Sequence, residues 1–280
     1  MALPLPFPIG IYEKALKPLA LPAMFADAVR AGYDTFEISL DESDYRLARL
    51  DWSAAEMRET RRAAEESGIR LYSACFSGHR KYALGSADPV TTRRAMDLMR
   101  KGLNFCVETG IRVLQLTGSD VYYEASSEES ARRYAENVAR GAEMAGDLGV
   151  MLAIEPVDKH IRSIRQALDI VREVNSPWLQ VYPDAANLLV EGFDPLAELE
   201  AGRGHLVGLH IRDALPGTSY NLPWGSGTLD FVAVLRTLQK INFHAPVLIE
   251  YWYIDEVDYL ERAARARKFL IDKITQAGLA

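Results

Sequence analysis

The sequence predicts one α/β domain over residues 1–280, built as a closed barrel of eight parallel strands and surrounding helices, a (β/α)8 TIM barrel. Eight short apolar runs recur along the chain, and segments with apolar residues every three or four positions separate them. No Gly-Ser linker, composition break or low-complexity tract divides the 280 residues. A chain of this length, 49% hydrophobic, can bury the core of such a barrel, which typically has about 250 residues.

The apolar runs are interpreted as strands because they are four to eight residues long and are bounded by turn-forming or polar residues. In chain order they are PFPIGIY (6–12), YDTFEISL (33–40), IRLYSACF (69–76), RVLQLTG (112–118), VMLAIE (150–155), WLQVYPD (178–184), HLVGLHI (205–211) and PVLIEYW (246–252).

The segments between the runs are expected to be helices. Residues 89–110 and 127–149 carry apolar side chains at helical spacing, and each segment closes with a glycine, a common helix stop. This alternation of strand and helix is typical of a parallel sheet. Eight units without a break favour closure into a barrel over an open sheet.

Composition limits the classes of partner. The net charge of -7 and the pI near 5.4 argue against a nucleic-acid surface, which needs a basic face, and favour a small substrate. No apolar stretch reaches the roughly 18 residues of a membrane span, and the first ten residues lack the pattern of a signal peptide, so we expect a cytoplasmic protein. Cys75 and Cys106 are expected to be buried free thiols.

Four polar residues at predicted strand ends point to a metal site. Glu155, Asp184, His210 and Glu250 are separated by 29, 26 and 40 residues, and each gap accommodates a helix and a return strand, so parallel strands bring the four together. Three oxygen ligands and one nitrogen suit one divalent ion, Mn²⁺, Zn²⁺, Co²⁺ or Mg²⁺. The alternative for any one of them is a helix cap, a loop charge or a core histidine.

Several runs along the chain resemble one enzyme family. IGIYEKAL, DESDYRLARLDW, GHRKYALGS, MRKG, GIRVLQLTGSDVYY, YPDAANL, GHLVGLHIRD and GSGTLDF are similar to the L-ribulose-5-phosphate 3-epimerases, also called L-xylulose-5-phosphate 3-epimerases. These belong to the xylose-isomerase-like barrel superfamily. The resemblance extends from about Ile9 to Leu270.

The resemblance implies a metal-dependent inversion of C3 in a ketopentose 5-phosphate. Such a reaction removes a proton beside a carbonyl and returns one to the opposite face, so it needs two acid/base groups and a cation that stabilises the enediolate. The resemblance assigns both proton transfers to Glu155 and Glu250, which are also ligands with Asp184 and His210. The implied substrates are L-ribulose 5-phosphate and L-xylulose 5-phosphate, in sugar catabolism.

Polar loop residues are the candidates for substrate binding. Cationic side chains suit the phosphate, tyrosines can wall the sugar, and Asn187 is placed to bind a hydroxyl. A solvated loop charge is the alternative for each cation. The candidates are Lys14, His79, Arg80 and Lys81 for the phosphate, with Arg46, Arg49 and Arg212 as alternative cations, and Tyr12, Tyr122 and Asn187 for the sugar. The glycine-rich WGSGTLD is either an anion-binding loop or a tight turn before a capped helix.

Two other functions share these features. An aldose-ketose isomerase acting on a hexulose 6-phosphate uses the same enediolate chemistry, and a non-catalytic sugar-phosphate-binding protein has no need of two metal-bound glutamates. A DNA-repair endonuclease of similar architecture requires a larger histidine set than the five histidines here. The family implies a homo-oligomer, most simply a dimer.

Overall fold

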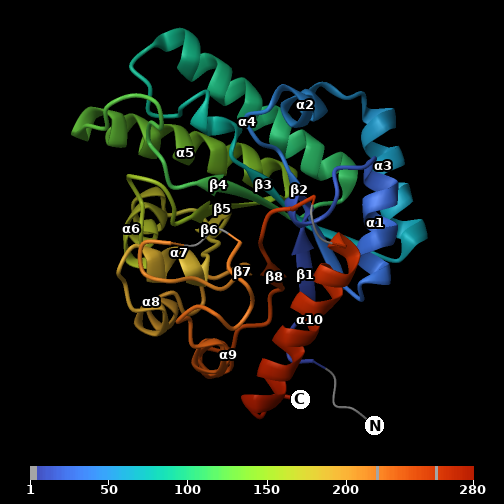
Figure 1. The fold of residues 1–280 in the computed structure, drawn as a ribbon. Coiled ribbons are helices and arrows are strands. Elements are labelled where there is room, and N and C mark those ends of the chain that lie inside the picture. The colour runs from blue at the N-terminus through green and yellow to red at the C-terminus, as the bar shows by residue number, and fades with distance from the viewer. Residues whose placement is uncertain (1–4, 219–220, 256–257) are drawn as a thin grey trace. The chain divides into compact units, whose positions relative to one another are not determined.

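The computed structural model describes residues 5–218, 221–255 and 258–280, and strands and helices alternate along this part of the chain (Figure 1). All eight predicted strands are present in it, each within its predicted run. They are β1 (Ile9–Tyr12), β2 (Thr35–Ser39), β3 (Arg70–Phe76), β4 (Val113–Thr117), β5 (Met151–Glu155), β6 (Leu179–Val181), β7 (Leu209–Ile211) and β8 (Val247–Ile249).

Helices connect the strands. The α-helices are α1 (Leu21–Arg30), α2 (Asp44–Leu47), α3 (Ala54–Ser67), α4 (Pro89–Thr109), α5 (Glu128–Leu148), α6 (Ile164–Val174), α7 (Ala185–Val190), α8 (Pro195–Ala201), α9 (Phe231–Lys240) and α10 (Tyr259–Gln276). Short 3₁₀ helices occupy Glu13–Ala15, Ala48–Asp51 and Gly78–Arg80.

The ends of α4 and α5 confirm the sequence prediction. Asp88 caps α4 by accepting hydrogen bonds from two backbone amides, and Ser127 caps α5 in a capping box. Gly110 and Gly149 end the two helices with φ values of 79° and 66°, which glycine adopts without steric cost.

The chain forms two compact units. The first comprises residues 1–37, 63–70 and 183–280, and the second comprises residues 38–62 and 71–182. In the first unit the parallel strands β2, β1, β8 and β7 are neighbours in that order. The second unit contains the parallel order β3, β4, β5 and β6. The prediction of a single domain stays a prediction.

The strand order is that of a βα barrel. Strand β2 runs from the first unit into the second, and the complete order is β6-β5-β4-β3-β2-β1-β8-β7. Residues that follow β6 also pair with β7, because the amide of His210 donates to the carbonyl of Pro183 at 2.9 Å, and Asp184 forms a parallel bridge with His210. The prediction of eight parallel strands with helices between them is confirmed.

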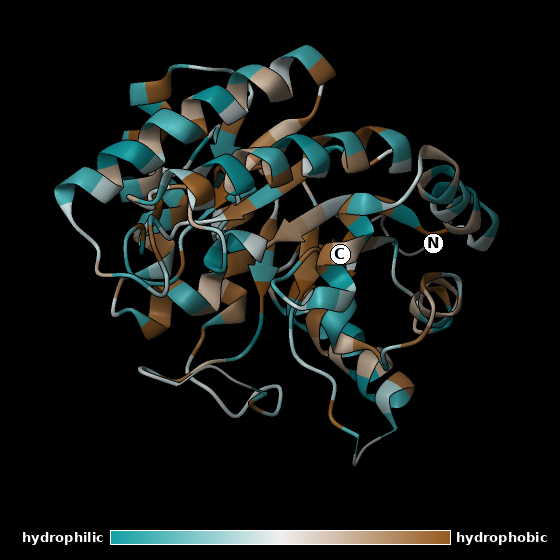
Figure 2. Cartoon of the chain, turned by 90° about the horizontal axis from the view of Figure 1, so that it is seen from above, coloured by the Kyte–Doolittle hydropathy of each residue, from teal (hydrophilic) through white to brown (hydrophobic). Residues whose placement is uncertain are grey.

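The helices bury one face each. Helix α6 buries Ile164, Ala167, Leu168 and Val171, which follow the spacing of one helical stripe. Figure 2 shows the consequence, since the helices carry both teal and brown residues. Burial of apolar stripes against the strands therefore accounts for the alternation seen in the sequence.

The two cysteines and the lengths of the helices bear on two further predictions. Cys75 lies in β3 and Cys106 in α4, and both are buried free thiols as predicted. Within residues 5–218, 221–255 and 258–280, every helix is too short or too polar to cross a lipid bilayer.

Candidate active site

Strand register places several polar side chains of the first unit on one face. Leu248 of β8 pairs with His210 of β7. Gly10 of β1 pairs with both Leu248 and Thr35 of β2, so these four residues form one row across the sheet. Side chains two residues apart along a strand point to the same face. Glu37 and Glu250, which follow Thr35 and Leu248 by two residues, therefore share the face of His210.

Glu37 and His210 contact each other although two strands separate them in the sheet. Oε1 of Glu37 lies 2.6 Å from Nε2 of His210, and both side chains are fully buried. With neighbouring strands about 4.8 Å apart, a flat sheet would separate β2 from β7 by roughly 14 Å. The contact is possible because the sheet of this unit curls and makes the shared face concave.

The second nitrogen of His210 lies beside Glu250. Nδ1 is 3.6 Å from Oε2 of Glu250, which is too long for a hydrogen bond. Two donor atoms that each bind one ion at about 2.1 Å, with tetrahedral angles, lie roughly 3.4 Å apart. The spacing therefore fits two ligands of a single cation, and imidazole with carboxylate is a donor set for Mn²⁺, Zn²⁺, Co²⁺ or Mg²⁺.

Arg212 connects three further side chains of the same unit. Its Nη2 lies 2.8 Å from Oδ2 of Asp184 and donates to Oδ1 of Asn187 at 2.5 Å. Its Nε donates to Oε2 of Glu250 at 3.4 Å, and its guanidinium carbon lies 5.4 Å from the centre of the Trp252 ring. Arg212 and Asn187, both predicted to contact substrate, thus hold the orientation of the two carboxylates.

This cluster carries more negative than positive charge. Glu37, Asp184 and Glu250 are three carboxylates against the single guanidinium of Arg212, and none of the four is more than 7% exposed. Burial raises the pKa of the Asp184 carboxyl to about 6; Arg212 opposes this rise and Glu250 adds to it. Buried charge of one sign needs a counterion, so a cluster with more acidic than basic side chains favours a bound cation.

Asp184 also begins helix α7. Its Oδ1 accepts a hydrogen bond from the amide of Ala186 at 2.7 Å, so the helix-cap alternative considered for this residue is realised together with the ion pair to Arg212. Its assignment as a metal ligand stays a prediction.

Glu155 ends β5 in the second unit. It is 6% exposed and follows the register Thr117↔Glu155. Like His210 and Glu250 of the first unit, Glu155 is a buried side chain of a type that can ligate a metal ion. A metal site is therefore supported at this level, and the identity of the metal stays a prediction.

Loops after β3, β4 and β5 of the second unit gather cations around one tyrosine. Arg80 donates two hydrogen bonds to Asp158, at 2.9 and 3.0 Å. Arg80 and Lys159 both lie over the ring of Tyr122, at 5.3 and 5.6 Å from its centre. Burial lowers the pKa of Arg80, but the hydrogen bonds and charge of Asp158 and the charge of Glu155 outweigh this effect and raise it.

Asp158 holds an unusual backbone conformation in this cluster. Its φ is 70°, in the left-handed region that is uncommon for residues other than glycine. The two hydrogen bonds from Arg80 hold the Asp158 side chain in place. They therefore help to stabilise the left-handed backbone conformation of Asp158.

The other predicted phosphate contacts lie in different settings. His79 is buried against Phe76, and its Nε2 donates to the carbonyl of Ala95 at 3.0 Å. Desolvation lowers the pKa of His79 to about 4, so its ring is neutral at pH 7. Lys81 is exposed, with its Nζ 3.5 Å from Asp44. Lys14 belongs to the first unit, where it lies over the ring of Tyr12 at 5.9 Å.

The glycine-rich loop after β7 already surrounds an anion, the carboxylate of Asp213. Oδ2 of Asp213 accepts hydrogen bonds from the amides of Gly225 at 2.7 Å and Gly227 at 3.0 Å, and Oδ1 accepts from the amide of Ala214. Asp230 caps α9. The tight-turn interpretation of WGSGTLD is therefore confirmed, and these amides are occupied by the protein itself.

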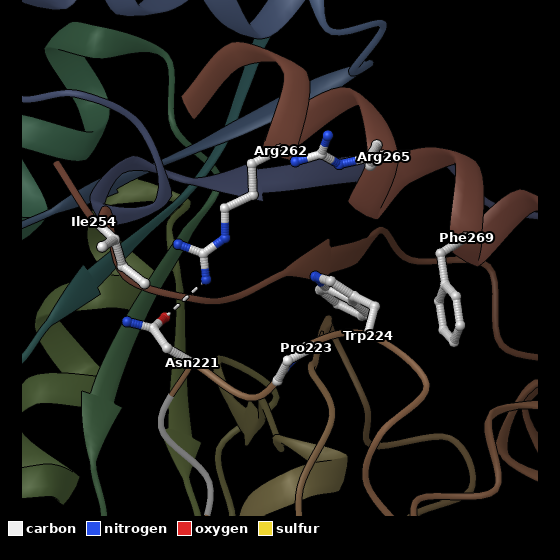
Figure 3. A pocket seen from close by; sticks show the side chains of 7 residues that line it. All are labelled: Asn221, Pro223, Trp224, Ile254, Arg262, Arg265 and Phe269. Carbon is white, nitrogen blue, oxygen red and sulfur yellow. Dashed lines mark hydrogen bonds between the residues drawn. The ribbon is translucent and has the colours of Figure 1, made fainter. Parts of the chain in front are cut away.

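A pocket of about 450 Å³ lies between this loop, the segment after β8 and helix α10 (Figure 3). Oδ1 of Asn221 accepts from the amide of Trp252 at 2.8 Å and from Arg262 at 3.3 Å. The pocket contains none of the predicted site residues, but two of its lining residues, Asn221 and Arg262, hydrogen-bond the backbone of Trp252. Its lining residues are Asn221, Pro223, Trp224, Ile254, Arg262, Arg265 and Phe269.

Sequence patterns missed the role of Glu37. A signal was present, because Glu37 is an acidic residue in the middle of the apolar run TFEIS, and a carboxylate there must find a partner. The partner, His210, is 173 residues away.

Comparison with known proteins agrees with the fold and the resemblance. The profile described as Xylose isomerase-like TIM barrel matches residues 25–273. The L-ribulose-5-phosphate 3-epimerase UlaE of Escherichia coli (strain SMS-3-5 / SECEC) is 39% identical over 279 residues, 97% of this chain and 96% of that protein. The chain belongs to the L-ribulose-5-phosphate 3-epimerase family of xylose isomerase-like TIM barrels. The predictions of a barrel fold and of an enzyme of the isomerase class are confirmed by this membership.

Solved structures extend the likeness in fold beyond this family. A D-psicose 3-epimerase, crystallised in the presence of D-fructose, superposes with a TM-score of 0.82 at 16% identity and covers 97% of this chain and 100% of that chain. An L-ribulose 3-epimerase gives 0.80 at 19% identity and covers 97% and 95%.

The buried position of His79 predicts a pH dependence of stability. The folded pKa of about 4 lies below the ordinary value of 6.5, so between these values the unfolded chain binds the proton that the folded protein excludes. The contribution of neutral His79 to the free energy of unfolding is fully present above pH 6.5. It is lost as the pH drops towards 4, by on the order of 3 kcal/mol. We expect His79→Gln to flatten this part of the profile in urea unfolding. The same change at exposed His244 should leave the profile unaltered.

The close packing of backbone amides around the Asp213 carboxylate leads us to expect that position 227 requires glycine. A Cβ atom there would lie 2.1 Å from Oδ1 of Asp213 and 2.4 Å from the carbonyl oxygen of Ala214. We expect Gly227→Ala to lower the free energy of unfolding by about 1–3 kcal/mol, measured by urea denaturation. The neighbouring Thr228→Ala, at an exposed side chain, should change it by less than about 0.5 kcal/mol. Equal stability of the two variants would contradict the assignment.

Proposed function

We propose that this enzyme inverts C3 of a ketopentose 5-phosphate and interconverts L-ribulose 5-phosphate and L-xylulose 5-phosphate. The observation that carries the proposal is the 39% identity over 97% of the chain with an L-ribulose-5-phosphate 3-epimerase. The concave face with His210 and Glu250 supports it, because both are buried at strand ends, where barrel enzymes hold their chemistry.

In this proposal Glu155, Asp184, His210 and Glu250 hold one divalent metal ion. The support is the excess of buried carboxylates in the first unit and the spacing of His210 and Glu250, which fits two ligands of one ion. Mn²⁺, Zn²⁺, Co²⁺ and Mg²⁺ all accept such a donor set. When bound, the ion supplies Lewis-acid stabilisation of the negative charge that develops beside C3.

The two glutamates are the proposed acid/base pair. Glu250 would take the C3 proton on one of its carboxylate oxygens, and Glu155 would return a proton to the opposite face; the roles exchange in the reverse reaction. Arg212 favours this use of Glu250, because its Nε faces Oε2 while Asn187 and Asp184 fix its other end. The ring of Trp252 lies 5.4 Å from the guanidinium carbon of Arg212, and this cation–π contact further restrains the guanidinium.

The proposed phosphate site is the cation cluster of Arg80, Lys159 and Tyr122. Asp158 fixes Arg80 through two hydrogen bonds, while Lys159 lies over the same tyrosine ring and is exposed. A guanidinium held in one orientation beside an exposed ammonium is a suitable receptor for a phosphate dianion. Lys81, Lys14 and His79 remain secondary candidates. The homo-oligomer and the cytoplasmic location remain predictions.

Substitution of either glutamate is expected to abolish turnover. Proton transfer by a positioned side chain contributes about 10²- to 10⁴-fold, so Glu155→Gln and Glu250→Gln should each lower kcat by at least 10²-fold. Proton NMR of the Mn²⁺-treated enzyme with L-xylulose 5-phosphate in D₂O follows the C3 proton, the C1 protons and the product together. Wild-type enzyme should lose the C3 signal as L-ribulose 5-phosphate forms.

Controls separate catalysis from folding and from metal loss. Circular dichroism and metal content are measured for each variant, since a glutamine ligand also weakens metal binding. Unchanged C3 protons in folded, metal-loaded wild-type protein would contradict the substrate assignment. Exchange at C1 of a hexulose 6-phosphate would then identify an aldose-ketose isomerase.

The phosphate site predicts a selective effect on the Michaelis constant. Loss of one charge-assisted hydrogen bond costs about 1.5–3 kcal/mol, so Lys159→Met should raise KM for the 5-phosphate roughly 10- to 100-fold with little change in kcat. Lys268→Met, at an exposed lysine on α10, is the matched control and should leave KM unchanged. L-Ribulose without phosphate serves as the second substrate, and an equal effect on both substrates would count against the assignment.

A further inference from the structure

Glu37 makes a contact that the proposed chemistry does not itself require. It lies in β2, is fully buried, and places Oε1 2.6 Å from Nε2 of His210. A carboxylate can only accept a hydrogen bond, so the proton of this contact belongs to Nε2.

The contact determines which nitrogen faces the cluster. With Nε2 protonated towards Glu37, the neutral imidazole has its lone pair on Nδ1, the atom that lies 3.6 Å from Oε2 of Glu250. The ring of Tyr12 lies 6.0 Å from the imidazole, centre to centre, on the same face. The ring of His210 is thus held between two carboxylates: Glu37 accepts from Nε2, and Glu250 lies 3.6 Å from Nδ1.

We infer that Glu37 is a positioning residue, which selects the His210 tautomer and makes Nδ1 the metal-binding nitrogen. A carboxylate that accepts from the far nitrogen of a ligating histidine also increases the basicity of that ligand, and removal of such a partner typically costs about 10- to 100-fold in metal affinity. The inference rests on the proposed metal centre, in which His210 is a ligand.

A structural role for Glu37 makes a different prediction. If the contact only ties β2 to β7 across the curled sheet, its loss lowers the stability of the metal-free protein and leaves the affinity for metal unchanged. Metal affinity, stability without metal and the His210 tautomer therefore have to be measured separately.

The test is a competitive titration of Mn²⁺ against a chelating dye for wild-type protein, Glu37→Gln and Glu198→Gln. Glutamine keeps the size of Glu37 and removes its charge. Glu198, on α8, is another buried glutamate and provides the matched control. We expect Mn²⁺ affinity to fall about 10- to 100-fold in Glu37→Gln and to stay unchanged in Glu198→Gln. Thermal unfolding of the metal-free proteins measures the structural effect.

The outcomes separate this inference from the proposed function. Tight Mn²⁺ binding by wild-type protein with the same affinity in Glu37→Gln overturns the role of Glu37 alone. Failure of wild-type protein to bind Mn²⁺ overturns the metal centre and the inference with it.

A second measurement does not depend on the Glu37→Gln variant. Long-range ¹H–¹⁵N NMR of the Zn²⁺-treated wild-type protein, with His210 assigned by comparison with His210→Gln, reports which ring nitrogen carries the proton. A proton on Nε2 supports the inference, and a proton on Nδ1 overturns it.

Discussion

The buried contact between Glu37 and His210 is the interaction on which the candidate site depends. It joins β2 to β7 across β1 and β8, so it forms only where the strands curl into a concave face. A carboxylate without exposed surface is costly unless it is hydrogen-bonded. The orientation of the His210 imidazole therefore depends on the curvature of the sheet.

Residues that follow His210 at the end of β7 position the other side chains of the candidate site. His210 and Arg212 are two residues apart and share a face, and Arg212 positions both Asp184 and Glu250. Asp213, one residue further on, organises the following loop through three backbone amides. Four consecutive residues therefore provide a metal-binding candidate, a cation that orients carboxylates and an anchor for a loop, because alternation along a strand separates their directions.

Local patterns in the sequence were sufficient for the architecture. Hydrophobic periodicity located all eight strands, and glycines located the ends of α4 and α5, because those signals depend on neighbours in the chain. The positions of His210 and Glu250 at the ends of predicted parallel strands also brought these two residues together. Glu37 and Asp213 escaped it, since their partners are decided by the curl of the sheet and by the path of a loop, which no short pattern encodes.

The cation cluster illustrates the same limit. Arg80 was recognisable as a loop cation, whereas its pairing with Asp158 depends on a left-handed residue in another loop, 78 residues away. Lys159 escaped notice because a lone lysine in a loop carries no signal until a ring such as that of Tyr122 is placed beneath it.

The nest that Asp213 fills has a consequence for how such enzymes diversify. Because the carboxylate of Asp213 already accepts from the amides of Gly225 and Gly227, these two amides are engaged without any ligand. Selection for a new substrate can then act on the loops after β3, β4 and β5 without disturbing the strand end that carries His210 and Arg212. Substitutions in those loops would leave the hydrogen bonds of Asp213 with its own loop intact.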